Sequence, residues 1–167
     1  MIATLQGIEG AGQHSFAIGS QHLIVGLISG VVTFVCVFLH YEAMSVCSMR
    51  IHRSSTRRRM RVFVLMLAML AAHVVEVWIF ALVYWALEAY PGLGVVQGAF
   101  EEGALDLVYF SVVNYTTVGY GDMTPTGALR ILAGTEALVG LSLITWSASL
   151  VFLEMQRDWA EHQRGPA

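Results

Sequence analysis

Three long apolar stretches alternate with polar segments along the chain. Residues 23–39 contain no charged side chain and lie between His22 and His40, and two further apolar stretches cover residues 62–87 and 131–153. Because an α-helix rises about 1.5 Å per residue, stretches of this length can cross a hydrocarbon core about 30 Å thick. A buried helix of a soluble protein is usually shorter and carries a polar stripe. The pattern therefore predicts three transmembrane helices.

A shorter apolar stretch at residues 104–115 separates the second span from the third. The segment before it, residues 88–103, is rich in glycine and acidic residues and contains a proline. Three acidic residues suit the positive N-terminal end of a helix dipole: Glu101, Glu102 and Asp106. The pattern predicts an exposed turret and then a helix too short to span. The backbone after this helix is not expected to be helical. At membrane depth such backbone is tolerated only where protein surrounds it or where it lines a water-filled space.

The composition places the chain in a membrane. Hydrophobic residues make up 56% of the sequence and charged residues 13%, against about 25% charged residues in soluble domains. The net charge of -3 is too small to indicate a nucleic-acid partner. Cys36 lies in an apolar stretch and Cys47 near arginines, so we expect both to be free thiols. Residues 1–21 lack the positively charged start of a signal peptide, and we expect them to stay attached.

The arginines predict the orientation. Six of the nine basic residues lie in residues 41–61, which we interpret as a loop, and short arginine-rich loops stay in the cytoplasm. Residues 156–167 carry two more arginines, and Arg130 is left on the outer side. The expected topology has residues 1–21 outside and the C-terminus in the cytoplasm, in the plasma membrane or the inner membrane of a bacterium. The arginines of residues 50–61 could also attract anionic lipids.

Ionisable side chains lie inside two predicted spans. His73 and Glu76 share one helical face near the middle of the second span, and Glu136 lies about two turns inside the third. Such groups are costly in a bilayer and need partners. The first pair is either structural or a proton-sensing switch, since histidine titrates near neutrality. Two ligands are too few to fill the coordination sphere of a metal ion. No nucleophilic side chain accompanies the pair, so the pair does not indicate an enzyme. Glu136 supports the segment at 116–122 or pairs with another helix.

Residues 116–122 have the sequence Thr-Thr-Val-Gly-Tyr-Gly-Asp. Glycine at positions 119 and 121 can adopt positive φ, so carbonyls that alternate in an ordinary strand can face the same way. A row of such oxygens, with the hydroxyl of Thr117, suits a dehydrated cation. The alternative is a simple turn between two helices, which glycine and aspartate also favour.

The five residues from Thr117 to Gly121 resemble the selectivity filter of potassium channels and match its Thr-Val-Gly-Tyr-Gly signature in full. Asp122 and Pro125 also fit the family pattern, and the resemblance extends from the second span to the end of the third. It implies that filter oxygens replace the hydration shell of K+. The residues implied in K+ binding are Thr117, Val118, Gly119 and Tyr120, with Gly121 completing the outer mouth.

The resemblance also assigns residues around the filter. It implies that Tyr109 and Phe110 pack against the filter, that Thr116 supports its start and that Asp122 lies behind it. Val113 stands where some bacterial members have a glutamate, which leaves open whether Asp122 bonds to Tyr109. Because the chain has one such motif and an ion needs a closed ring of ligands, the resemblance implies a homotetramer.

The third span holds the remaining gating candidates. Gly140 matches the bending point of the family's inner helix, and close helix packing is an equal alternative. Further along the same helix, four residues are candidates to line a water-filled cavity below the filter: Ile144, Thr145, Ala148 and Phe152. Phe152 is also a candidate hydrophobic gate. No span carries an arginine ladder, so the usual kind of voltage sensor is not expected.

The sequence thus predicts an all-α membrane protein that assembles as a four-fold tetramer. The expected parts are an outer tail (1–21), an extra transmembrane helix (22–40), a cytoplasmic loop (41–61), a pore domain (62–155) and a cytoplasmic tail (156–167). Within the pore domain we expect an outer helix (62–87), a turret (88–103), a pore helix (104–115), the filter (116–121) and an inner helix (131–153).

The predicted function is passive, potassium-selective conduction, with no enzymatic activity and no cofactor beyond K+ in the filter. The expected partners are copies of the chain and the lipid bilayer, with no nucleic acid. The alternatives are a weakly selective cation channel, a subunit that conducts only beside another chain, or a non-conducting membrane sensor.

Overall fold

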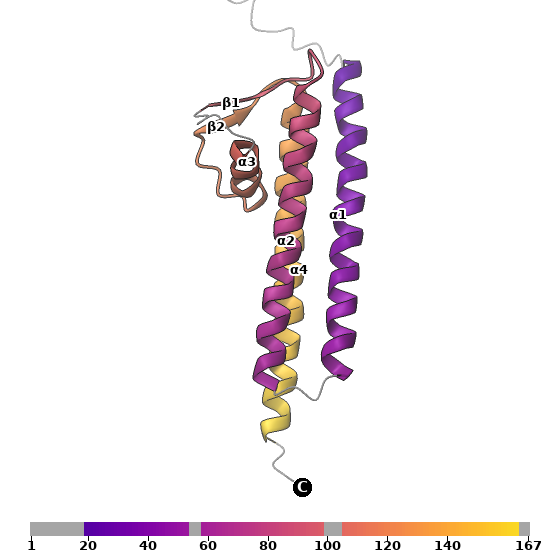
Figure 1. Ribbon diagram of the computed structural model, residues 1–167, viewed down its shortest axis with the longest axis vertical. Coiled ribbons are helices and arrows are strands. Elements are labelled where there is room, and N and C mark those ends of the chain that lie inside the picture. Colours follow the sequence, from indigo (N-terminus) through magenta and orange to yellow (C-terminus); the bar gives the residue numbers. More distant parts are fainter. Residues whose placement is uncertain (1–18, 54–57, 99–104, 164–167) are drawn as a thin grey trace, which may run out of the picture.

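A computed structural model describes residues 19–53, 58–98 and 105–163 of the chain. In chain order these residues form α1 (Ser20–Arg53), α2 (Arg58–Glu88), β1 (Val96–Gly98), α3 (Leu105–Tyr115), β2 (Met123–Pro125) and α4 (Leu129–Gln163). The three long helices run side by side along the long axis of the molecule (Figure 1). In the same view, α3 and the two strands lie beside one end of α2 and α4, opposite α1.

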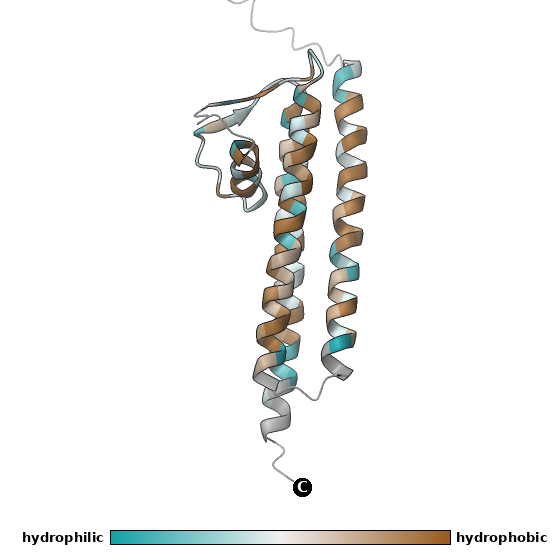
Figure 2. Cartoon of the chain, in the orientation of Figure 1, coloured by the Kyte–Doolittle hydropathy of each residue, from teal (hydrophilic) through white to brown (hydrophobic). Residues whose placement is uncertain are grey.

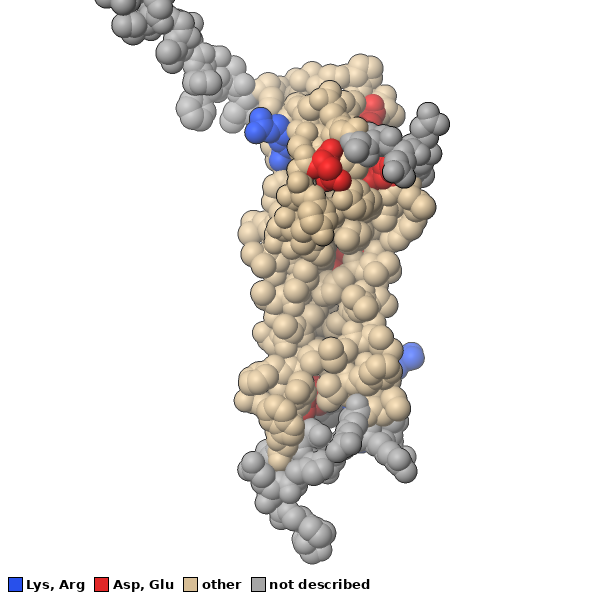
Figure 3. Space-filling model, turned by 90° about the vertical axis from the view of Figure 1, so that its left-hand side faces the viewer, with Lys and Arg blue, Asp and Glu red and all other residues tan. Residues whose placement is uncertain are grey.

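All three long helices are long and apolar enough to cross a membrane. The candidate spans are Ser20–Arg50, Met60–Glu88 and Leu129–Arg157. Hydrophobic residues cover most of the length of each helix (Figure 2). Most of the surface between the two ends of the molecule carries no charged side chain on the face shown in Figure 3. The three spans predicted from hydropathy are therefore confirmed as helices of suitable length and composition.

The helices extend further than the apolar stretches indicated. The prediction of a loop over residues 41–61 was wrong, because α1 continues to Arg53 and α2 begins at Arg58. Likewise, residues 156–163 belong to α4 and not to an irregular tail. Neither extension contains glycine or proline, so local propensity permits helix beyond the apolar part. Hydropathy reports where a helix leaves the hydrocarbon, and it does not report where the helix ends.

A small β-sheet corrects the all-α prediction. β1 and β2 pair antiparallel, with Val96 opposite Pro125 and Gly98 opposite Met123. Gly98 has a φ of 144°, and a Cβ there would overlap the carbonyl oxygen of Asp122. Strands of three residues are too short to produce an alternating pattern in the sequence. The sheet joins the segment before α3 to the segment after residues 116–122, so both ends of this loop are fixed together.

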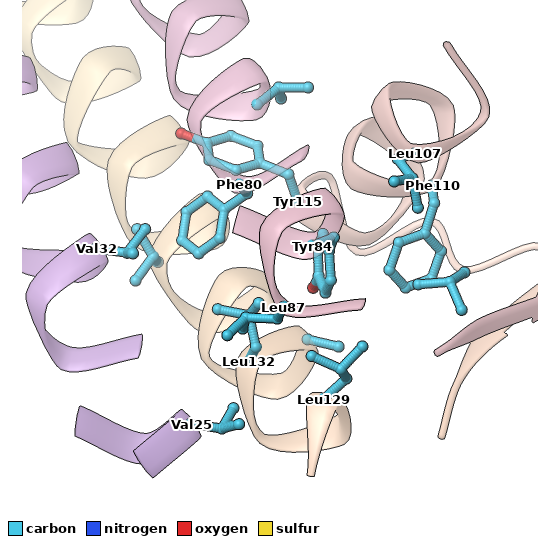
Figure 4. Close-up of a cluster of buried hydrophobic side chains, with 14 of the residues drawn as sticks. Val25, Val32, Phe80, Tyr84, Leu87, Leu107, Phe110, Tyr115, Leu129 and Leu132 are labelled. Atoms are coloured by element: carbon cyan, nitrogen blue, oxygen red, sulfur yellow. The ribbon is translucent and has the colours of Figure 1, made fainter. Parts of the chain in front are cut away.

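The buried side chains come from all four helices. Figure 4 shows residues of α1, α2 and α4 meeting around Phe80 and Leu132, while Phe110 of α3 approaches Tyr84 of α2. The rings of Tyr84 and Phe110 pack edge to face, with centroids 5.1 Å apart. In a bilayer, lipid is as apolar as such a core, so close packing and hydrogen bonds hold the helices together.

Candidate functional site

Residues 116–121 follow α3 without regular secondary structure, and their backbone alternates in conformation. Positive φ angles occur at Thr117 (61°), Gly119 (56°) and Gly121 (81°), while Val118 and Tyr120 between them are ordinary. The positive φ expected at the two glycines is thus present. Thr117 was not expected to share it, since a residue with a Cβ pays about 1–2 kcal/mol in this region.

Hydrogen bonds from the end of α3 hold the strained start of this segment. The backbone N–H of Thr117 donates to the carbonyl of Asn114 at 2.9 Å. The N–H groups of Val118 and Gly119 both donate to the carbonyl of Val113, at 3.1 and 3.2 Å. The segment is therefore anchored to the helix terminus, which offsets the conformational cost at Thr117.

The segment is open on one side within a single chain. Val118 is 54% exposed and Tyr120 is 72% exposed. A Cβ built at Gly119 or Gly121 would meet no atom within 4 Å. A single copy of the segment therefore cannot enclose an ion. Any ion held along it would need further ligands from outside the chain.

Tyr109 connects α3 to the end of the segment. Its hydroxyl donates a hydrogen bond of 2.8 Å to Oδ2 of Asp122. This bond, which the sequence left open because position 113 is valine, therefore forms without a glutamate there. The bond to the Asp122 carboxylate raises the pKa of the Tyr109 phenol, because losing the proton would break the bond and place two negative charges together.

Glu136 joins three helices behind the same segment. Its side chain is fully buried and accepts hydrogen bonds from the hydroxyl of Tyr84 (2.7 Å), from Nδ2 of Asn114 (2.7 Å) and from the hydroxyl of Ser111. The Ser111 oxygen also lies 2.9 Å from the carbonyl oxygen of Val77, and its one hydroxyl proton is shared between these two acceptors. The predicted pairing of Glu136 with another helix is confirmed by its bonds to Tyr84 of α2 and to Ser111 and Asn114 of α3, and support of residues 116–122 stays a prediction.

A family model described as "Ion channel" matches residues 63–157, which is more than half of the chain. The matched range runs from the start of the second span to the end of the third and includes α3, the segment at 116–122 and the small sheet. The chain belongs to this ion channel family. No curated protein and no solved structure matches it.

α1 precedes the part of the channel that the family model matches. It packs against both α2 and α4 along its length. The side chain of Gln21, at its start, approaches Gly92 just beyond α2. Cys36 and Cys47 of α1 are both free thiols, as predicted.

The predicted pair of His73 and Glu76 is part of a larger polar cluster in the channel. Nδ1 of His73 lies 3.2 Å from Oε2 of Glu76, which confirms that the two side chains contact each other. Tyr115, at the end of α3, donates to the same carboxylate oxygen. Oε1 of Glu76 lies 2.8 Å from Nδ1 of His40, a residue of α1.

Sequence reasoning missed His40 as a member of this cluster. It treated His40 as the polar boundary of the first span, whereas the side chain is fully buried and well inside α1. Residues 43–47 are again mostly apolar, so a longer window would have placed His40 within the span. Its other ring nitrogen, Nε2, lies 2.9 Å from Oγ of Ser147 on α4. No pattern in the sequence indicated Ser147.

The inner-helix candidates differ in their surroundings. α4 is one helix throughout, and a Cβ at Gly140 would overlap the carbonyl oxygen of Tyr115. Gly140 therefore allows the end of α3 to approach α4, which is the packing role predicted as one alternative. Of the cavity-lining candidates, Thr145, Ala148 and Phe152 are exposed in the single chain and Ile144 is half-buried.

Proposed function

We propose that this channel is potassium-selective and that residues 117–121 form its selectivity filter. The proposal is supported by the full Thr-Val-Gly-Tyr-Gly match, by the alternating positive φ angles and by membership of an ion channel family. The observation that carries it is the backbone conformation, because alternating left-handed residues allow successive carbonyls to face one axis. An ordinary strand directs them to opposite sides.

In this proposal the filter binds K+ through protein oxygens alone. Carbonyl oxygens of Thr117, Val118, Gly119 and Tyr120, with the hydroxyl of Thr117, replace the water around the ion. Gly121 completes the outer mouth. The bonds from Thr117 to Asn114 and from Tyr109 to Asp122 hold the two ends of the strand, so the oxygens need little reorganisation when the ion enters.

The assembly we propose is a homotetramer. The exposed side of the filter strand, where Val118 and Tyr120 project, would then face neighbouring copies. Exposed residues of α4, including Thr145 and Phe152, would line the cavity below the filter, with Phe152 as a hydrophobic gate. Closed symmetry around one axis supplies four strands to each ion from a chain that contains one.

The proposed orientation places the filter toward the outside of the cell membrane. The end of α1 at Arg53 and the start of α2 at Arg58, which carry most of the clustered arginines, lie at the opposite end of the molecule from α3 (Figure 1). Arginine-rich segments remain cytoplasmic, so the N-terminus lies outside and the C-terminus inside. We propose that the clustered arginines also attract anionic lipid headgroups.

Uptake of radioactive rubidium into liposomes tests the proposal. Protein verified as a tetramer should load the ion down its gradient, and excess external K+ should compete where Na+ does not. Equal competition by both ions would replace the proposal with a weakly selective cation channel. No uptake from verified tetramers would favour a membrane sensor or a subunit that needs another chain.

A further inference from the structure

A buried polar cluster lies where α1, α2, α3 and α4 meet. It consists of His40 from α1, His73 and Glu76 from α2, Tyr115 from the end of α3 and Ser147 from α4. The His40 and Glu76 side chains are 0% and 1% exposed, and that of His73 is 16% exposed. The proposed filter mechanism does not use this cluster.

The donor atoms of this cluster converge on one point. Nδ1 of His40 lies 2.8 Å from one oxygen of Glu76, and Nδ1 of His73 lies 3.2 Å from the other. The Tyr115 oxygen lies 2.9 Å from Nδ1 of His73 and bonds to Glu76. One ligand atom from each of His40, His73 and Glu76 lies within 4.8 Å of the others.

The cluster contains the carboxylate of Glu76, whose negative charge a bound cation would balance. The hydrogen-bond partners of Glu76 within the described residues are two imidazoles and a phenol, and none of these carries a fixed positive charge. A carboxylate at this depth in a bilayer is costly without a positive partner. A divalent ion would supply that partner while using the imidazoles in their neutral form.

We propose that this cluster binds a divalent transition metal of the Zn²⁺ class. The ligands are Nδ1 of His40, Nδ1 of His73 and the carboxylate of Glu76, with the oxygen of Tyr115 as the fourth after its phenol proton is released to solvent on metal binding. Zn²⁺ accepts nitrogen and oxygen ligands in a tetrahedron, with ligand atoms about 3.4 Å apart. One ligand atom from each of His40, His73 and Glu76 lies within 4.8 Å of the others, so the side chains must adjust to reach this spacing around an ion. The two ligands visible in the sequence become four because α1 and α3 supply the others.

Ser147 supports the same proposal as a positioning residue. A metal at Nδ1 of His40 requires the proton of that ring to be on Nε2, which lies 2.9 Å from the Ser147 hydroxyl. A hydroxyl can accept as well as donate, so this bond persists when the ring changes tautomer. Such hydrogen bonds to the second ring nitrogen orient histidine ligands in metal sites.

A groove gives access to the cluster from the side of the molecule. Its volume is about 350 Å³, and its lining includes Phe63, Leu70 and Val151 together with His73 and Ser147. His73 borders the groove and also contributes a ligand, so the groove reaches the edge of the cluster. A bound metal would fasten α1, which precedes the family-matched part of the chain, to the pore-forming part.

Metal binding by tag-free tetramers tests the proposal and does not depend on ion conduction. Equilibrium dialysis against Zn²⁺ alone should give one ion per chain. Co²⁺ in its place should produce the intense visible absorption of a four-coordinate site. His40→Gln and His73→Gln should abolish both, and Ser147→Ala should weaken Zn²⁺ binding by about 10- to 100-fold.

His22→Gln is the matched control, because this exposed histidine at the start of α1 lies outside the cluster. It should bind Zn²⁺ as the wild type does. Wild-type protein that binds no Zn²⁺ would overturn the proposal, and so would undiminished binding in His73→Gln. If His40→Gln fails to fold, the wild-type Co²⁺ spectrum still decides, since the weak absorption of six-coordinate Co²⁺ would contradict the four-ligand site.

Discussion

The hydroxyl of Tyr109 donates a 2.8 Å hydrogen bond to Asp122, although position 113 between them in sequence is valine. The bond ties α3 to the residue that follows the proposed filter. Asp122 is also the residue whose carbonyl lies against Gly98 of the small sheet. One aspartate thus connects the outer end of the filter to the helix beside it and to the strand before it.

Removing the donor should weaken this outer end. Tyr109→Phe keeps the ring and deletes the hydroxyl, so we expect K+ flux that declines faster with time or is lower than in the wild type. Liposome flux measured over time checks this. Asp122→Asn should have a similar effect, because a neutral amide is a weaker acceptor than a carboxylate. Identical time courses in Tyr109→Phe and the wild type would contradict a supporting role for the bond.

The effect of Tyr109→Phe should not depend on pH near neutrality. The pKa of the phenol is raised above its ordinary value by the bond to Asp122. The protonated form therefore contributes its full stabilisation below about pH 10, and the contribution is lost only as pH rises through the raised pKa. The ratio of wild-type to variant flux should stay constant between about pH 6 and about pH 9. A ratio that changes within this range would show that another group controls the bond.

Glu136 should be a major determinant of stability. In Glu136→Gln a neutral amide oxygen replaces the carboxylate oxygen that accepts from Tyr84 and Asn114, and Ser111 keeps the carbonyl of Val77 as its acceptor. A hydrogen bond to a charged group contributes about 1.5–3 kcal/mol and one between neutral groups about 0.5–1.5 kcal/mol. We expect the thermal unfolding midpoint of the protein to fall accordingly.

Glu154→Gln provides the matched control for this carboxylate. Glu154, which is 15% exposed, pairs with the 62% exposed Arg157 at 2.8 Å near the end of α4. Because solvent reaches the arginine and screens the pair, we expect a contribution of about 0–1 kcal/mol. A loss in Glu136→Gln no larger than that in Glu154→Gln would contradict the role assigned to Glu136.

The two interpretations of Gly140 predict stability changes of opposite sign. If bending is its role, Gly140→Ala stiffens α4 and stabilises the folded helix by about 0.5–1 kcal/mol. If close approach is its role, the added methyl group overlaps the Tyr115 carbonyl and the protein becomes less stable. The structure favours the second outcome. Thermal unfolding of the purified protein distinguishes these two outcomes.

Gly134→Ala is the control for this experiment. Gly134 lies in the same helix, and a Cβ there would meet no atom within 4 Å. This variant should be as stable as the wild type or slightly more stable, by the helix propensity of alanine. If Gly140→Ala behaves in the same way, the packing of α3 against α4 at this position is not restrictive.

Local features of the chain predicted the spans, the short helix and the filter segment. A transmembrane helix is specified by a run of apolar residues, and the proposed filter by five adjacent residues, so neither requires knowledge of distant contacts. The acidic residue Asp106 in the first turn and the apolar positions after it likewise predicted α3 to within one residue of its observed start.

The parts that the sequence did not predict depend on contacts between distant residues. His40 contacts Ser147, although more than a hundred residues separate them in the sequence. Apolar residues lie on all sides of the membrane-spanning part of α1, so no polar stripe indicated which face of the helix packs against α2 and α4. The strand pairing of Val96 with Pro125 similarly joins segments separated by α3. Hydropathy indicates whether such a residue lies inside the membrane, but it does not indicate which distant residue it contacts.

The reversal potential of the channel in liposomes tests the central claim most directly. Purified protein should be reconstituted with a high K+ concentration on one side and a tenfold lower K+ concentration on the other, where Na+ makes up the difference. The account predicts zero current near the equilibrium potential of K+, and a Gly119→Ala variant should carry less current. A reversal potential near zero would show that K+ and Na+ pass equally well, and it would contradict the assignment of residues 117–121 as a potassium-selective filter.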